Sequence, residues 1–215
     1  MENSILILIG APGAGKGTQA KKIAESNNYI LISTGDILRD NVEKNTKIGI
    51  EAKSYMDKGV LVPTELVVDM IRLEVKKSEA SRNFLFDGFP RDLNQNGLLE
   101  KMLLEFNMNV DKVIYINVDD NIIYDRITNR RICPKCKRVY HIKYNLPKED
   151  NLCDDCKVEL IIRNDDKTDV IKKRLDVYHN QTEPLISYYN NLKKLVTVNG
   201  EKSTDDVYKE IISYM

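Results

Sequence analysis

A glycine-rich segment, GAPGAGKGT at residues 10–18, follows directly on the apolar run ILILI at residues 5–9. Glycines lack Cβ atoms, so such a loop can adopt positive φ angles and turn successive backbone N–H groups inward as an anion cradle. A helix beginning near Gly15 would add the positive end of its dipole, and Lys16 would add a full charge. The segment therefore predicts a strand, a phosphate-binding loop and a helix, whereas a glycine-rich turn without a ligand would not require the lysine.

The segment departs from the general phosphate-loop pattern at one position. That pattern has Ser or Thr directly after the lysine, whereas Gly17 stands there and Thr18 follows. Thr18 is therefore the candidate hydroxyl near a magnesium ion.

Short β-branched runs recur along the chain and are separated by segments of helical length. Continuous rather than alternating apolarity is typical of parallel strands that are covered on both faces, which predicts a three-layer α/β sandwich. The loops after Ile9, Ile32, Phe86 and Val118 should converge on one crevice at the carboxyl ends of the strands. The five predicted strands are residues 4–10, 29–34, 84–89, 112–118 and 194–200.

Length and charge limit the alternatives. The 215 residues suffice for one main domain with excursions, and 42% apolar with 31% charged residues is typical of a globular protein. Lys plus Arg and Asp plus Glu both number 33, so no overall field would hold a nucleic acid. The run ILILI is too short for a membrane span and has no basic leader, so a cytoplasmic location without a membrane partner is expected.

Two intervals are longer than a simple connection between strands. Residues 35–83 have helical periodicity at 36–45, 50–59 and 65–77, which predicts a small helical unit that stands partly off the sheet. Residues 129–166 contain all four cysteines, several turn residues and little apolar periodicity. This second interval is predicted to be an insertion held together by a metal.

Asp87 ends the predicted strand of FLFDGFPR and lies beside the expected crevice. A carboxylate at that point can hold Mg²⁺ through water, although a helix cap or turn is the simpler alternative. Phosphoryl transfer depends mainly on alignment and on neutralisation of charge, for which arginines and a lysine are suited. Only two histidines occur, and no Ser-His-Asp pattern or nucleophile elbow is found. The candidate arginines near the crevice loops are Arg39, Arg91, Arg126, Arg163 and Arg174.

CPKC at residues 133–136 and CDDC at 153–156 form two Cys-x-x-Cys pairs with sixteen residues between them. This spacing predicts a tetrahedral structural Zn²⁺ site, because four thiolates close the coordination shell and leave no open position for catalysis. Two disulfides or free thiols are the alternatives. A zinc ribbon that binds nucleic acid is a rival function, opposed by the zero net charge and the complete phosphate loop. The predicted ligands are Cys133, Cys136, Cys153 and Cys156.

The chain resembles the nucleoside monophosphate kinases, in particular the adenylate kinase family with a cysteine-bearing lid. The resemblance rests on ILILIGAPGAGKGTQA, ISTGDILR, DGFPR, DRITNRR, RVYH, RNDD and RLDVYHNQTEPLISYY. It implies reversible, Mg²⁺-dependent transfer of the terminal phosphoryl group of ATP to AMP, giving two ADP, in a monomer. It also implies a core of residues 1–32, 63–128 and 167–215, an AMP-binding unit at 33–62 and a zinc lid at 129–166. Uridylate or cytidylate acceptors and a GTP donor remain alternatives.

The resemblance also implies site residues. Lys16, Asp87, Arg91, Arg126, Arg163 and Arg174 would serve the reaction. ATP would contact Gly13, Ala14, Gly15, Lys16, Gly17, Thr18, Arg126, Val139, Tyr140 and the backbone of Lys202. AMP would contact Thr34, Arg39, Val60, Leu61, Val62, Gly88, Arg91, Gln95, Arg163 and Arg174. The chain departs from the commoner family pattern after DGFPR, where Asp92 replaces a Thr and Asn94 replaces a frequent Pro.

Overall fold

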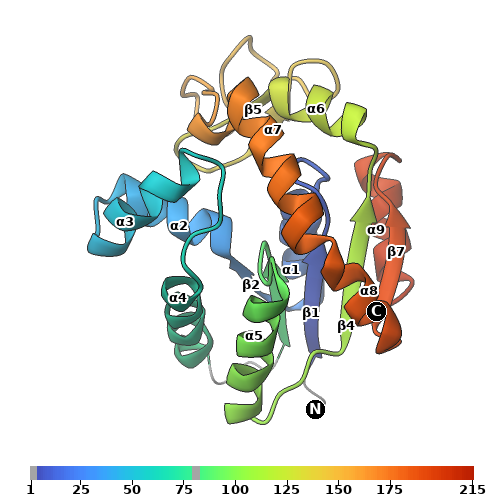
Figure 1. Cartoon of the computed structure of the whole chain (residues 1–215). Coiled ribbons are helices and arrows are strands. Elements are labelled where there is room, and N and C mark those ends of the chain that lie inside the picture. The colour runs from blue at the N-terminus through green and yellow to red at the C-terminus, as the bar shows by residue number, and fades with distance from the viewer. Residues whose placement is uncertain (1–3, 79–82) are drawn as a thin grey trace.

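A five-stranded parallel sheet lies at the centre of the chain in a computed structural model that describes residues 4–78 and 83–215 (Figure 1). The strand order is β2-β3-β1-β4-β7, and every neighbouring pair is parallel. The predicted runs match the strands to within two residues at each end. The strands are β1 (Ser4–Ile9), β2 (Ile30–Ser33), β3 (Asn83–Asp87), β4 (Lys112–Asn117) and β7 (Leu195–Asn199).

Helices cover both faces of the sheet, so the predicted three-layer sandwich is confirmed. Alternate residues of β1 show this directly, because Ile5, Ile7 and Ile9 belong to one buried cluster and Leu6 and Leu8 to another. The first cluster includes α4 (Thr64–Lys77), α5 (Leu93–Glu105) and α8 (Pro184–Asn191). The second includes α1 (Lys16–Asn27), α6 (Asp120–Thr128), α7 (Thr168–Val177) and α9 (Thr204–Ile212).

The strand order places a crevice beside β1. From β1 the chain crosses to β2, beyond β3, and from β3 it returns to β4 on the other side of β1. The connections therefore diverge between β1 and β3, which is where an open α/β sheet binds ligands. Leu8 of β1 pairs with Asp87 of β3, so the phosphate loop and Asp87 leave the sheet side by side.

Both long intervals stand off the sheet (Figure 1). The first contains α2 (Thr34–Glu43) and α3 (Lys47–Met56), which with α4 are the three predicted helices. The second contains the antiparallel pair β5 (Arg130–Ile132) and β6 (Val139–His141), which the sequence did not reveal because each strand has only three residues. The predicted domain boundaries remain expectations, and residues 1–3 and 79–82 of the predicted core lie outside the described residues. None of the described helices is both long and apolar enough to cross a bilayer.

A π-helical turn, η2 (Tyr178–Thr182), joins α7 to α8. The Glu183 N–H donates to the Tyr178 carbonyl at 2.9 Å, one residue further back than in an α-helix. Pro184 follows at the start of α8 and has no N–H to continue the α-helical pattern. The extra residue rotates the following side chains by about 100° relative to a continuous helix.

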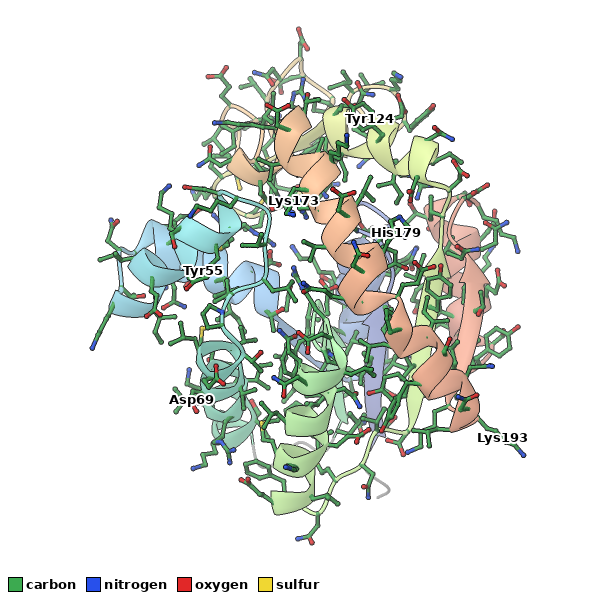
Figure 2. All side chains as sticks on the ribbon, viewed as in Figure 1. Tyr55, Asp69, Tyr124, Lys173, His179 and Lys193 are labelled. Carbon is green, nitrogen blue, oxygen red and sulfur yellow. The ribbon has the colours of Figure 1, made fainter. Side chains whose placement is uncertain are left out.

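His179 in this turn lies between two carboxylates. Its Nε2 is 2.9 Å from Asp120 Oδ2, and its Nδ1 is 2.9 Å from Glu183 Oε2. His179 is labelled in Figure 2. The hydrogen bond to Glu183 and the contact with Asp120 raise the pKa of His179, because both favour the imidazolium.

We expect this contact to make stability depend on pH. A raised pKa means that the stabilisation is complete below the unfolded value of about 6.5 and disappears as pH rises through the higher folded value. His179→Gln should therefore lower the Tm most near pH 6 and least above pH 8. The loss in the free energy of unfolding should stay below about 1 kcal/mol because the site is partly exposed. Thermal unfolding of both proteins across this range measures the effect, and a Tm difference independent of pH would contradict it.

Candidate active site and metal centre

The phosphate loop has the geometry of an anion cradle. Gly13 and Gly15 have φ angles of 86° and 99°, and α1 begins directly after them at Lys16. The Lys16 ammonium folds back over the loop and donates to the carbonyls of Gly10 at 2.7 Å and Ala11 at 2.8 Å. Burial lowers the pKa of Lys16 to about 8, and nearby Asp87 opposes this shift. An anion bound in the loop would raise this pKa again, because it favours the charged ammonium.

Asp87 lies against the phosphate loop. A Cβ atom added at Gly17 would lie 3.3 Å from Asp87 Oδ2, a tight contact that would require a small shift of the carboxylate. Ser33 Oγ donates to the same carboxylate oxygen at 3.3 Å. The position of the carboxylate beside the loop favours the Mg²⁺ interpretation of Asp87 over a helix cap or turn. A strand-end carboxylate of this kind fits a hydrated Mg²⁺ that accompanies a nucleotide.

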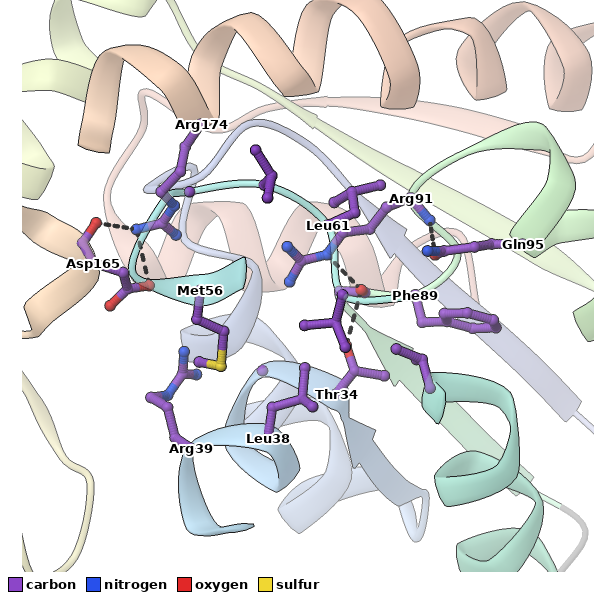
Figure 3. Close-up of a pocket in the computed structure, with 16 residues that line it drawn as sticks. Thr34, Leu38, Arg39, Met56, Leu61, Phe89, Arg91, Gln95, Asp165 and Arg174 are labelled. Carbon is purple, nitrogen blue, oxygen red and sulfur yellow. Dashed lines mark hydrogen bonds and ion pairs between the residues drawn. The ribbon is translucent and has the colours of Figure 1, made fainter. Parts of the chain in front are cut away.

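A cavity lies on the other side of this crevice, between α2, the loop before α4 and the loop after β3 (Figure 3). Thr34 Oγ1 donates to the Gly88 carbonyl at 2.9 Å, and Arg91 Nε donates to the same carbonyl at 2.8 Å. The structure brings nearly all the predicted AMP residues into this cavity. They are Thr34, Arg39, Val60, Leu61, Val62, Gly88, Arg91, Gln95 and Arg174, with Leu38, Met56, Phe89 and Asp165 as additional lining residues.

Asp92 caps α5 and explains one departure from the family pattern. Its Oδ1 accepts from the Gln95 N–H at 2.7 Å, while Gln95 Oε1 accepts from the Arg91 N–H at 2.9 Å. A threonine would cap the helix in the same way. The predicted AMP residues Arg91 and Gln95 therefore depend on a cap that the aspartate preserves.

Asp92→Ala is expected to lower the free energy of unfolding by about 1 kcal/mol, because one N–H of the first turn loses its acceptor. It should also raise the KM for AMP, since the N–H that Asp92 caps belongs to Gln95, a predicted AMP residue. Asp92→Thr should restore both properties. Urea unfolding and steady-state kinetics of the three proteins test this, and an alanine variant that equals wild type in both would show that the cap is unimportant.

A buried carboxylate joins two arginines beside the cavity. The Asp166 side chain is fully buried and accepts from Arg130 Nε at 2.8 Å and Arg174 Nη1 at 3.1 Å. Burial alone would lower the pKa of Arg130, but its hydrogen bonds and ion pair with Asp166 raise it. Arg130 also lies within electrostatic range of Lys16. Arg130 was missed as a candidate, although its place in DRITNRR was a signal.

Arg163, which the resemblance assigns to AMP, is not among the residues that line this cavity. It lines an adjacent groove between α2, α3 and the cysteine-bearing interval, together with Arg39 and Asp165. Burial, together with the neighbouring charge of Arg39, lowers the pKa of Arg163 to about 10. Its Nε is buried without a hydrogen-bond partner among the described residues. An unpaired buried donor of this kind suits an anionic oxygen of a ligand.

The predicted ATP residues of the lid lie apart from this cavity. Arg126 Nη2 donates to the Gly200 carbonyl at 2.9 Å, so Arg126 and the loop after β7 are neighbours. Lys202 is exposed in this loop, and its ammonium pairs with Glu210 at 2.8 Å. Tyr140 follows Val139 in β6, but its side chain is buried and turned toward the cysteines. Only the backbone of Tyr140 is therefore available to a nucleotide.

The four cysteine sulfurs lie within 4.8 Å of one another, and none is in a disulfide. Cys136 Sγ and Cys153 Sγ are 3.6 Å apart, far beyond an S–S bond and close to the spacing of about 3.8 Å that tetrahedral Zn–S bonds of 2.3 Å produce. Tyr140 Oη donates to Cys153 Sγ at 3.5 Å and lowers the pKa of that thiol to about 6. The crowded sulfurs raise the pKa of Cys156 to about 12, which a bound dication would reverse. This donor set fits Zn²⁺ and excludes the disulfide alternative.

A phosphate loop and a neighbouring cavity lined by arginines are typical of a P-loop phosphotransferase. The family model described as adenylate kinase matches residues 8–194. Adenylate kinases from Acetivibrio thermocellus, Clostridium novyi and Caldicellulosiruptor saccharolyticus are 48%, 46% and 46% identical, over 97%, 98% and 96% of this chain and 96%, 97% and 96% of their own lengths. The chain therefore belongs to the adenylate kinase family, which confirms the predicted fold and enzyme class.

Proposed function

We propose that this chain transfers the terminal phosphoryl group of ATP to AMP, reversibly and with Mg²⁺, to give two ADP. One observation carries the proposal beyond family membership. Lys16 of the phosphate loop lies within electrostatic range of Arg91 and Arg174, which line the second cavity. Positive charge from two nucleotide sites therefore meets at one point, where a phosphoryl group passing between them would carry negative charge.

The reaction needs no protein nucleophile. An oxygen of the AMP phosphate attacks the γ-phosphorus of ATP in line, the new P–O bond forms, and the bond to the β-phosphate oxygen breaks so that ADP leaves. Mg²⁺, when bound with the nucleotide, neutralises phosphate charge, and Asp87 and Thr18 are the candidate residues around it. Lys16, Arg91, Arg126, Arg163 and Arg174 would align the phosphates and neutralise the transferring group, and Arg130 joins this set.

The AMP subsite is assigned to the cavity of Figure 3, and its charge distribution supports this. Arg39, Arg91 and Arg174 line the cavity and could bind a phosphate, while Leu38, Met56 and Val62 supply apolar surface for a base. The ATP subsite is assigned to the phosphate loop and to the contact of Arg126 with the loop after β7. A guanidinium can stack on an aromatic base, so Arg126 and the backbone of Val139, Tyr140 and Lys202 would hold the adenine.

We also infer that residues 33–62 and 129–166 close over the nucleotides. Two observations support this arrangement. Lys137 of the lid forms an ion pair with Glu43 of α2, and residues of both units line the groove between them. Closure of this kind excludes water from the transferring phosphoryl group. The lid would carry a structural Zn²⁺ on Cys133, Cys136, Cys153 and Cys156.

A monomer that does not bind nucleic acid is part of the proposal. Four of the basic lid residues that a zinc ribbon could use form ion pairs within the chain, which supports the absence of nucleic-acid binding. Arg130 pairs with Asp166, Lys137 with Glu43, Arg138 with Asp155 and Lys143 with Asp125. A cytoplasmic location stays a prediction.

Base selectivity is tested by giving the protein ATP with AMP, UMP, CMP or GMP, and AMP with ATP or GTP. The proposal predicts the highest kcat/KM with the pair ATP and AMP. Faster transfer to UMP or CMP would replace the AMP assignment while leaving the phosphoryl chemistry intact.

A further inference from the structure

Thr182 makes the one long-range hydrogen bond found for the Arg91 backbone among the described residues. Its Oγ1 donates to the Arg91 carbonyl at 2.7 Å, across 91 positions of sequence. The Thr182 residue is 8% exposed, so little water can replace this donor. The other contacts of Arg91 are local, from its Nε to Gly88 O and from its N–H to Gln95 Oε1.

The π-helical turn accounts for the direction of the Thr182 hydroxyl. Thr182 is the last residue of η2, and the extra residue in this turn rotates it relative to the α7 pattern. Figure 1 shows α7 running from the lid into α8, and Arg174 lies on α7 eight residues before Thr182. The continuous helical segment formed by α7 and η2 therefore carries Arg174 and also binds the backbone of Arg91.

The distance between Arg91 and Arg174 matters because their positive charges repel each other. Burial lowers the pKa of Arg91 to about 10, and the charge of Arg174 is the next largest cause. Like charges that must bind one phosphate group would move apart without restraint, so an anion needs them held before it arrives. Both line the AMP cavity from different parts of the chain.

We propose that Thr182 is a positioning residue for AMP, which acts by holding the Arg91 backbone at a fixed place relative to Arg174. This inference rests on the proposed function, in which both arginines bind phosphate. Thr182→Val keeps the shape of the side chain and removes the donor, whereas Thr182→Ser keeps the donor.

The kinetic test varies AMP at saturating ATP and ATP at saturating AMP. Thr182→Val should lower kcat/KM for AMP by about tenfold, since a small misplacement of an aligning group has effects of this size or larger, and it should leave the KM for ATP within about twofold. Thr182→Ser should restore the AMP kinetics. Unchanged AMP kinetics in the valine variant would overturn the proposal, as would equal increases in both KM values.

A double-mutant cycle separates positioning from general destabilisation. If Thr182 acts through Arg91, Thr182→Val should change the Kd for AMP by less than about twofold in an Arg91→Ala background. An undiminished effect in that background would contradict the inference. Ile211→Val, a buried change on α9 outside the site, is the stability control and should lower the Tm without changing the KM for AMP. Absence of AMP turnover in wild type would instead refute the proposed function.

Discussion

Lys16→Ala should lower kcat by about 10²- to 10³-fold or more while the protein stays folded, because it removes a positive charge placed at the phosphates where negative charge develops. The Lys16 ammonium already lies over the phosphate loop, where it donates to the Gly10 and Ala11 carbonyls. Its removal takes away the donor to these two carbonyls but no apolar side chain of the core. The measurement is steady-state turnover, with circular dichroism to verify folding.

Lys22→Ala is the matched control for this change. Lys22 lies on the same helix, but its ammonium pairs with exposed Asp205, away from the loop. Its replacement should leave kcat within about twofold, since exposed ion pairs contribute little. Near-normal turnover by folded Lys16→Ala, or equal losses in both variants, would show that the phosphate loop does not carry the chemistry.

Cys153→Ser is expected to lower the Tm by about 10 °C, which corresponds to roughly 4 kcal/mol in a chain of this length. Cys153 is fully buried among the other sulfurs, so loss of one ligand removes most of the stabilisation that a closed Zn²⁺ site provides. Turnover at low temperature should fall much less, because a closed four-thiolate site has no open position for substrate. Zinc content per chain, the Tm and turnover are measured together.

Lys135→Ala, in the exposed turn of the first cysteine pair, is the control and should keep its zinc. Equal loss of turnover and stability in a folded Cys153→Ser protein would contradict a structural role. Zinc content unchanged by the serine would contradict the ligand assignment.

The phosphate loop, the strands and the cysteine cluster could be predicted because each is encoded within a short segment. The run from Ile5 to Ile9 is apolar at every position, so it required burial on both faces, and Gly13 and Gly15 required a tight loop. The metal site could be predicted from spacing alone, since a Cys-x-x-Cys pair can supply two ligands to one metal locally.

The missed features depend on contacts between distant segments. Arg130 and Arg131 are adjacent in sequence, and only the pairing of β5 and the position of Asp166 distinguish them. Thr182 could not be found by helical periodicity, because it is the last residue of the π-helical turn that interrupts the pattern. Arg163, predicted for AMP together with Arg39, lines the neighbouring groove and not the cavity of Figure 3.

The most direct test of the central claim gives purified, chelator-free protein only ADP and Mg²⁺ and separates the nucleotides by ion exchange over time. The account predicts that ATP and AMP appear in equal amounts, since one ADP donates the phosphoryl group that another accepts. No ATP or AMP from folded protein, or phosphate release without ATP, would contradict phosphoryl transfer between two nucleotide sites.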